Sequence, residues 1–432
     1  MLPFCNKIIR YQFNNSIKHS DILKLFPVYF FIWLSFVSCG KKNPTNPPQW
    51  KKEANAATIN LSAQKQIIRG FGAANIVYWT PDLTSGEINK AFGTGKGQLG
   101  FSILRIQIPP QKDQFKRDVP TAKKAYSMGV KIIASPWTPP PSMKTNDNKV
   151  GGRLKKGKYS DYAAYLQSFN TYMQNNGVPL YAVSVQNEPD ISVNYASCHW
   201  NASEMVQFMK NNAQTIDTRV IAPESYDFNK AISDSILENP AAAKNLDIVG
   251  GHIYGGGLKP YPLAKRKGKE VWMTEHLDTT TTYKADLKTG KEIHDCLTYA
   301  HFNAYVWWYI KRFYGPMDKN GNITKRGYIM SNYARFIRPG YHRMEATSNP
   351  QPNVYVGAYK GDNKLVIIAI NMSSTYKKQQ FILSNSTITS LTPYVTTSSM
   401  NVSEKKSVSV LTDHSSYSYN LPPQSIITFL GK

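Results

Sequence analysis

The feature that most constrains the fold of this 432-residue chain is a regular alternation between residues 67 and 339. Short apolar runs, typical of buried parallel strands, are separated by longer segments with helical spacing, of which 160–176 and 203–216 are the clearest. The strand-like runs are residues 68–72, 102–108, 131–135, 180–185, 219–222, 246–249, 270–274 and 304–308. Eight β-then-α units over about 270 residues predict an α/β fold, a (β/α)8 TIM barrel.

The pattern changes after Tyr341. Apolar or alternating runs separated by Ser, Thr, Asn and Gly turns predict an associated antiparallel β-sandwich side domain. These runs are residues 354–359, 364–371, 379–383 and 425–430. Residues 57–61 have the same character, so we expect 57–66 to be an N-terminal strand of that domain, 67–339 the barrel, and 340–432 the rest of the side domain.

The N-terminus predicts export. An apolar run at 26–38 follows Lys18 and Lys24; it is too short to span a bilayer and has the length of a signal-peptide core. Ser38 before Cys39 resembles a bacterial lipobox, in which the cysteine is lipidated, although Phe36 stands where a lipobox usually has Leu. We therefore predict a signal peptide at 1–38, a lipid-anchored tether at 39–56, and a bacterial lipoprotein of the periplasm or cell surface. A plain signal peptide with an incidental cysteine is the alternative.

Charge and cysteine content limit the binding partners and cofactors that can be predicted. The net charge of +24 favours a polyanion, although a basic solvated surface explains it equally well. No nucleic-acid-binding motif is present, so nucleic acid is not predicted. Export permits a disulfide between Cys198 and Cys296, which the sequence does not decide. No cysteine or histidine spacing matches a metal site, and neither a metal nor another cofactor is predicted.

Two carboxylates stand at strand ends. The run at 180–185 leads into Asn187-Glu188-Pro189, and the run at 270–274 leads into Glu275. Active sites of such barrels lie at the C-terminal ends of the strands. A single glutamate there is commonly structural, but this pair on the fourth and seventh strands suits glycoside hydrolysis, which needs one protonated and one ionised carboxyl group.

The pair resembles the large clan of retaining glycosidases built on strands 4 and 7. Further segments are similar to glycoside hydrolase family 30, namely residues 68–72, 99–105, 134–140, 183–190, 220–225, 252–255 and 271–275. Residues 305–316 and 325–328 resemble its glucuronoxylanase branch, and the likeness runs from about 58 to 430. It implies a glucuronoarabinoxylan endo-1,4-β-xylanase that acts on an acidic plant polysaccharide, glucuronoxylan. We also expect a monomer, although the sequence does not report the oligomeric state.

The resemblance also implies roles for single residues. Glu188 matches the general acid/base and Glu275 the nucleophile, while Asn187 matches the amide that binds the sugar's 2-hydroxyl. Arg105 matches an arginine that orients the nucleophile and keeps it ionised, since a nearby positive charge lowers a carboxyl pKa. Three aromatic residues are expected to line the −1 subsite, although each also suits a core: Trp79, Trp137 and Tyr254.

Substrate selection is implied by the segment after the eighth strand. Arg312 matches an arginine that binds the carboxylate of a methylglucuronic acid branch, with Tyr314 beside it and Trp308 and Tyr309 just before. A guanidinium pairs with a carboxylate in a directional way that lysine matches poorly.

Two loops depart from the family pattern, residues 191–200 and 276–283, where Trp-rich and Tyr-rich sequences are usual. They leave the strictness of glucuronate recognition open. Another family 30 activity, such as a β-xylosidase, 1,6-glucanase, glucosylceramidase or xylanase without glucuronate dependence, is one alternative, against which Arg312 and its segment argue. A non-catalytic glycan-binding lipoprotein is the other, against which the presence of both carboxylates argues.

Overall fold

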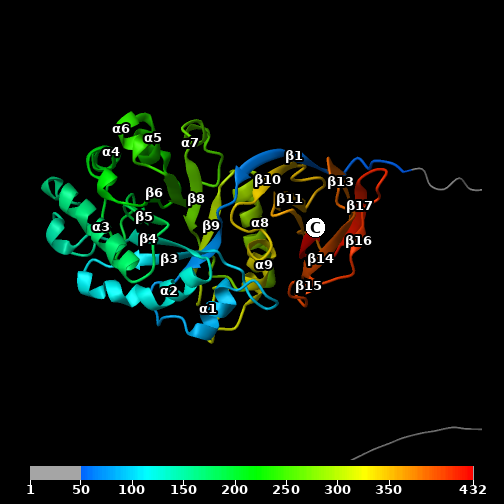
Figure 1. The fold of residues 1–432 in the computed structure, drawn as a ribbon, viewed down its shortest axis with the longest axis horizontal. Helices are drawn as coiled ribbons and strands as arrows, with labels where there is room; N and C mark the ends of the chain where they lie inside the picture. The colour runs from blue at the N-terminus through cyan, green and yellow to red at the C-terminus, as the bar shows by residue number, and fades with distance from the viewer. Residues whose placement is uncertain (1–49, 432) are drawn as a thin grey trace, which may run out of the picture. The chain divides into compact units, whose positions relative to one another are not determined.

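The computed structural model describes residues 50–431 (Figure 1). The predicted signal peptide, the lipidation of Cys39 and nearly all of the predicted tether lie outside these residues. Within them, no helix is both long and apolar enough to cross a membrane.

Eight parallel strands close into a barrel in sequence order, which confirms the predicted fold. The strands are β2 (Gly70–Ala74), β3 (Ile103–Ile108), β4 (Lys131–Pro136), β5 (Ala182–Ser184), β6 (Arg219–Ser225), β7 (Ile248–His252), β8 (Glu270–Glu275) and β9 (Ala304–Tyr309). Apolar side chains from the first halves of these strands, including Ile103, Ile221 and Trp272, form a buried cluster inside the barrel. The opposite, C-terminal ends of the strands are therefore where polar side chains can meet.

Helices follow the strands around the barrel. They are α1 (Ser85–Phe92), α2 (Val119–Ser127), α3 (Tyr159–Asn175), α4 (Ala202–Asn211), α5 (Lys230–Glu238), α6 (Pro240–Lys244), α7 (Pro262–Arg266), α8 (Tyr283–Thr298) and α9 (Lys325–Ala334). A capping box between Asn201 and Glu204 begins α4. This helix ends before the expected 216, and a 3-10 turn at Ala213–Thr215 follows it.

The side domain is one hydrogen-bonded sheet. Its strands are β1 (Ala57–Ile67), β10 (His342–Ala346), β11 (Val354–Gly361), β12 (Lys364–Asn371), β13 (Lys377–Ser384), β14 (Ser390–Thr396), β15 (Ser403–Glu404), β16 (Val408–Ser409), β17 (Ser416–Leu421) and β18 (Ser425–Gly431). The sheet curls over its own core, because the Phe381 ring of β13 lies 5.4 Å from the Phe429 ring of β18.

The sheet is mixed rather than purely antiparallel as predicted. The N-terminal strand β1 pairs antiparallel with β10 but parallel with β13. Parallel neighbours need a crossover between them, and here the whole barrel lies in that connection.

Helices α8 and α9 lie between the barrel strands and the sheet (Figure 1). The Thr428 hydroxyl of β18 donates to the backbone carbonyl of Asn332 in α9 at 2.8 Å, and the Tyr283 hydroxyl of α8 donates to the carbonyl of Gln424 at 2.7 Å. These helices directly follow the segments that carry Glu275 and Arg312, so the sheet supports that side of the barrel.

The two cysteines within residues 50–431 are free. Cys198 lies after β5 and Cys296 lies in α8, and both thiols are buried. The structure therefore answers the question that the sequence left open, and the permitted disulfide is not formed.

Candidate active site

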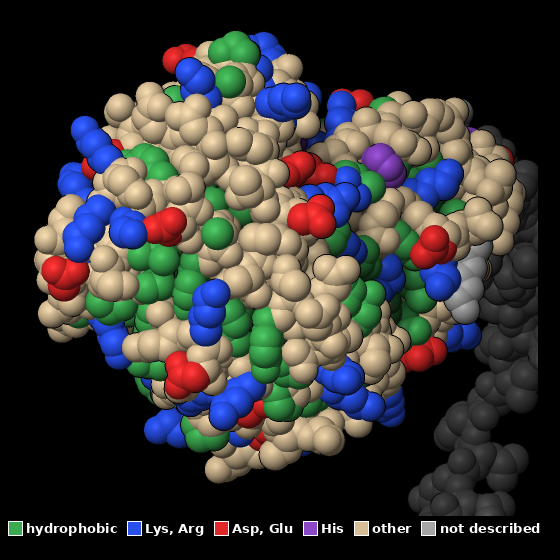
Figure 2. Space-filling model, turned by 60° about the vertical axis from the view of Figure 1, so that its left-hand side comes forward, with side chains coloured by type: hydrophobic (Ala, Val, Ile, Leu, Met, Phe, Trp, Pro, Cys, Tyr) green, Lys and Arg blue, Asp and Glu red, His purple; other side chains and the backbone are tan. Residues whose placement is uncertain are grey.

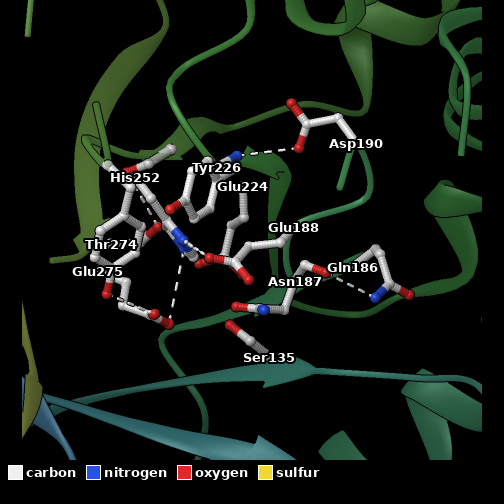
Figure 3. Close-up of polar contacts among 12 residues, drawn as sticks. Ser135, Gln186, Asn187, Glu188, Asp190, Glu224, Tyr226, His252, Thr274 and Glu275 are labelled. Carbon is white, nitrogen blue, oxygen red and sulfur yellow. Dashed lines mark hydrogen bonds and ion pairs between the residues drawn. The ribbon is translucent and has the colours of Figure 1, made fainter. Parts of the chain in front are cut away.

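Two nearly buried carboxylates face each other at the C-terminal end of the barrel (Figure 3). Glu275 is the last residue of β8 and is 6% exposed; Glu188 lies four residues after β5 and is 4% exposed. An oxygen of one carboxylate lies within 4.8 Å of an oxygen of the other. The structure thus brings together the two glutamates that the sequence analysis paired.

The backbone before Glu188 is tied to its neighbours although it has left the strand. The Asn187 N–H donates to the carbonyl of Pro136 at 2.8 Å, and the Glu188 N–H donates to the carbonyl of Glu224 at 3.0 Å. Glu188 has a φ of 46°, a left-handed conformation that is uncommon for a residue with a side chain. Such strain is maintained only where surrounding contacts impose it, and it is found most often at functional sites.

Arg105, fully buried in β3, connects the site. Its guanidinium donates to Glu275 Oε2 at 2.6 Å, to Asn187 Oδ1 at 2.6 Å and to Ser135 Oγ at 3.2 Å. It also lies 3.4 Å from Glu224. A planar, permanently charged group with five donors can hold several acceptors in one arrangement, which lysine cannot do.

His252, at the end of β7, lies between the two carboxylates and is fully buried. Its Nδ1 is 3.0 Å from Glu188 Oε1, and its Nε2 is 4.0 Å from Glu275 Oε2. Burial lowers the pKa of His252, but the two carboxylates outweigh this effect and the pKa is raised. No role for His252 was predicted from the sequence, although its place at a strand end was an available signal.

The surroundings shift the two carboxyl groups in opposite directions. Burial raises the pKa of Glu188, but hydrogen bonds from His252 and Tyr195, together with the positive charges of His252 and Arg105, outweigh it and the pKa lies below its usual range. Burial also raises the pKa of Glu275, and here His252 and Arg105 do not offset it. Arg105 therefore lowers the Glu275 pKa as expected, but the burial of this carboxyl group has the larger effect and the net direction differs from the expectation.

Two more functional candidates were missed from the sequence. Glu224, in β6, is fully buried; burial raises its pKa, but Arg105, His252 and hydrogen bonds from two serines together outweigh this effect and the pKa is lowered. Tyr195, in the loop after β5, donates its hydroxyl to Glu188 Oε2 at 2.9 Å. Glu224 stands near a strand end, as His252 does, whereas nothing local in the sequence marks Tyr195.

The predicted sugar-binding aromatics gather beside the carboxylates. The rings of Trp79 and Trp137 are 5.3 Å apart, and those of Trp137 and Trp308 are 5.7 Å apart. Trp137 is almost fully buried, and the centre of its ring lies 4.8 Å from the Arg105 guanidinium, so this residue also packs in the core. Trp79 is 37% exposed and offers an accessible ring. The Tyr254 hydroxyl donates to Glu275 Oε1 at 3.0 Å.

Arg312 and its neighbours form a second polar group after β9. The Arg312 guanidinium lies 4.7 Å from the centre of the Tyr309 ring. A hydrogen bond from Arg312 lowers the pKa of Tyr314, but burial has the larger effect and that pKa is raised. The charge of Glu275 adds to the rise in both tyrosine pKa values, so the group lies within electrostatic reach of the carboxylate pair. Among residues 50–431, no carboxylate is within ion-pair distance of half-buried Arg312.

Carboxylate and imidazole groups also bind metals, and the cluster of Glu188, His252 and Glu275 contains both. Here the Arg105 guanidinium already contacts Glu275, so the protein itself supplies a positive charge to the cluster. The arrangement suits chemistry in which two carboxylates act on one bond from nearby positions.

A (β/α)8 barrel with such a carboxylate pair at the ends of its fourth and seventh strands defines a glycoside hydrolase. Comparison with known proteins gives the family: residues 100–214 match the glycosyl hydrolase family 30 TIM-barrel domain. Glucuronoxylanase XynC of Bacillus subtilis (strain 168) is 46% identical over 391 residues, which cover 87% of this chain and 92% of the relative. The chain belongs to glycoside hydrolase family 30.

Solved structures agree with this assignment. A family 30 subfamily 8 xylanase from Clostridium acetobutylicum superposes with a TM-score of 0.82 at 40% identity, covering 88% of this chain and all of the other. A family 30 endoxylanase from Clostridium papyrosolvens gives 0.81 at 41% identity, covering 87% of this chain and all of the other.

Proposed function

We propose that this glycoside hydrolase is a retaining endo-1,4-β-xylanase that cleaves glucuronoxylan, with Glu275 as nucleophile and Glu188 as acid/base. The observation that carries the proposal is that one oxygen of Glu188 lies within 4.8 Å of one oxygen of Glu275. Retaining enzymes hold the pair about 5–5.5 Å apart, whereas inverting enzymes need about 6.5–9.5 Å to admit a water molecule. The similar proteins named glucuronoxylanase and xylanase support the substrate.

In the first step Glu275 attacks the anomeric carbon while Glu188 gives its proton to the departing glycosidic oxygen. Arg105 and Tyr254 hold one oxygen of Glu275 each, so the carboxylate is oriented before the substrate arrives. Arg105 also donates to the side-chain Oδ1 of Asn187, so the NH2 of that amide points away from Arg105. That NH2 group has no partner among residues 50–431 and is available to the sugar's 2-hydroxyl, where donation strengthens in the transition state.

In the second step water attacks the glycosyl-enzyme and Glu188 takes a proton from it. Glu275 then leaves as a carboxylate, and the two inversions give net retention. The donors around Glu188 favour its ionised form, which is the form that this step requires.

Arg312 is the group that we assign to the branch of the substrate. It is a half-buried cation with no carboxylate partner in the described part of the chain, beside Tyr309 and Tyr314 and within reach of the catalytic pair. A glucuronate carboxylate would supply the missing charge. Lys and Arg side chains are also scattered over the face drawn in Figure 2. This distributed positive charge would attract any acidic polymer, whereas recognition of the branch itself is assigned to Arg312.

The experiment that tests this function compares glucuronoxylan with unsubstituted xylan. We expect mass spectrometry of the glucuronoxylan products to show one glucuronate per oligosaccharide, because each cut is placed relative to a branch. Equal activity on linear xylan would contradict the role of the branch. Release of single xylose units would indicate a β-xylosidase, and cleavage of 1,6-glucan in place of xylan would indicate a glucanase.

The stereochemistry is a separate prediction. Because the carboxylates are close together, proton NMR during hydrolysis should show the β-anomer of the new reducing end before mutarotation begins. Initial release of the α-anomer from this β-linked substrate would show inversion and would overturn the double displacement.

The lipid anchor at Cys39, the exported location and the monomeric state stay predictions from the sequence, since the described residues do not bear on them.

A further inference from the structure

Both oxygens of Glu188 are already occupied by protein groups. Oε1 lies 3.0 Å from Nδ1 of His252, which is fully buried at the end of β7. Oε2 accepts the hydroxyl of Tyr195 at 2.9 Å. Tyr195 is 40% exposed, so the oxygen that can be reached from the cleft is Oε2. A proton given to a substrate must leave from that oxygen.

The loop that carries Tyr195 contains neither helix nor strand, yet a second loop holds it. The Ser197 N–H donates to the carbonyl of Lys149 at 2.9 Å, and the Gly151 N–H donates to the Ser197 hydroxyl at 2.9 Å. That hydroxyl in turn lies 3.0 Å from the carbonyl of Tyr195 and donates to it. The position of the Tyr195 backbone therefore depends on segment 149–151.

A buried ammonium group joins the two loops. Lys144 is fully buried, and its Nζ donates to the carbonyl of Ser197 at 2.6 Å, the carbonyl of Lys149 at 3.2 Å and the hydroxyl of Thr138 at 2.9 Å. Thr138 follows Trp137 of the aromatic cluster. Burying a cation without a carboxylate is costly, and no carboxylate among residues 50–431 pairs with Lys144. Such a cation is retained where its directional hydrogen bonds hold a required geometry.

The contacts seen here suit Glu188 as a base but not as an acid. Two donors on one carboxylate favour the ionised form, and they lower the Glu188 pKa against the effect of burial. In the first step Glu188 must instead carry a proton, so one donor has to withdraw. His252 is enclosed in the barrel, whereas Tyr195 is exposed and lies on a loop.

We propose that Tyr195, on a loop held by Lys144, is a positioning residue for Glu188. The Tyr195 hydroxyl occupies Oε2 of Glu188 in the free enzyme and is displaced by the glycosidic oxygen of the bound substrate. The inference rests on the proposed function, because it takes Glu188 as the acid/base. Its consequence is that the protonated form of Glu188, which the first step requires, is favoured only when a substrate is in place.

The test is a pH profile, and the groups that surround Glu188 must be considered together. The charged or titratable ones are Arg105, Tyr195, Glu224, His252, Tyr254 and Glu275. Because these groups are coupled, each limb of the profile reports an apparent pKa of the cluster. Tyr195→Phe removes one hydroxyl and leaves the ring and the other groups in place.

We expect Tyr195→Phe to move the basic limb of kcat/KM to higher pH by about 0.5–1 unit, since the hydrogen bond that lowers the Glu188 pKa in the free enzyme is lost. The acid form is present below that pKa, so raising the pKa extends activity upward. The basic limb of kcat reports the substrate complex. It should stay in place, because the substrate has already displaced the hydroxyl.

Lys144→Met should move the kcat/KM limb in the same direction, and adding it to Tyr195→Phe should move it no further. Tyr126→Phe is the matched control, because Tyr126 is 41% exposed on α2, and should move neither limb. If Lys144→Met does not fold, Tyr195→Phe alone decides the proposal.

An unmoved kcat/KM limb in Tyr195→Phe would show that the hydroxyl does not control Glu188. Equal movement of both limbs would show that Tyr195 stays on Glu188 in the complex. Either result overturns the inference while the enzyme remains a xylanase. A wild-type protein without activity on any xylan would instead defeat the proposed function.

Discussion

Replacing Glu275 with glutamine is expected to abolish turnover, with kcat reduced on the order of 10⁴-fold or more. The amide is nearly isosteric but cannot form the glycosyl-enzyme, so neither step proceeds. Glu188→Gln should fail for another reason. It removes the proton donor, so an aryl xyloside with a good leaving group should still glycosylate Glu275, and the enzyme should then stall because no base activates water.

Azide separates the two roles. It needs no base, so adding it to Glu188→Gln should restore turnover and give the β-glycosyl azide, identified by NMR. Glu345→Gln, on an exposed glutamate in β10 of the side domain, is the control and should retain wild-type rates. Formation of the β-azide by the Glu275 variant in place of the Glu188 variant would reverse the two assignments.

Arg312→Ala should reduce kcat/KM on glucuronoxylan by about 10- to 150-fold, which corresponds to about 1.5–3 kcal/mol for a hydrogen bond to a charged group. On unbranched xylan the same change should have little effect, because that substrate has no carboxylate to bind. On glucuronoxylan, the kcat/KM of Arg312→Lys should fall between those of the wild type and Arg312→Ala, since lysine keeps the charge but not the planar donor pair.

This difference between substrates is the measurement that decides the role of Arg312. Arg266→Ala, on exposed α7, is the matched control and should affect both substrates little. Equal losses on both xylans in Arg312→Ala would show that the guanidinium only supports the loop through its contact with Tyr309. Equal activity of the wild-type enzyme on both xylans would indicate that the altered loops at 191–200 and 276–283 have relaxed the specificity for the branch.

The barrel was predictable because each buried parallel strand is a continuous apolar run, which is a local property of the sequence. The same rule placed Glu188 and Glu275 at one rim, since all strand ends of a parallel barrel meet there. The parallel pairing of β1 with β13 was not predictable in this way, because strand direction in the side domain depends on how the chain returns after the barrel.

The chain by itself determined the fold class, the pairing of two carboxylates on strands 4 and 7, and the position of Arg312 after the eighth strand. Only the tertiary structure decided which groups touch those carboxylates. His252 bridges them, and Tyr195 reaches Glu188 through a loop tied by Lys144. It also decided the directions of their pKa shifts, because burial outweighs His252 and Arg105 at Glu275, whereas hydrogen bonds and nearby positive charges together outweigh burial at Glu188. The physical reason is that periodicity depends on neighbours along the chain, whereas hydrogen bonding and desolvation depend on residues far apart in it.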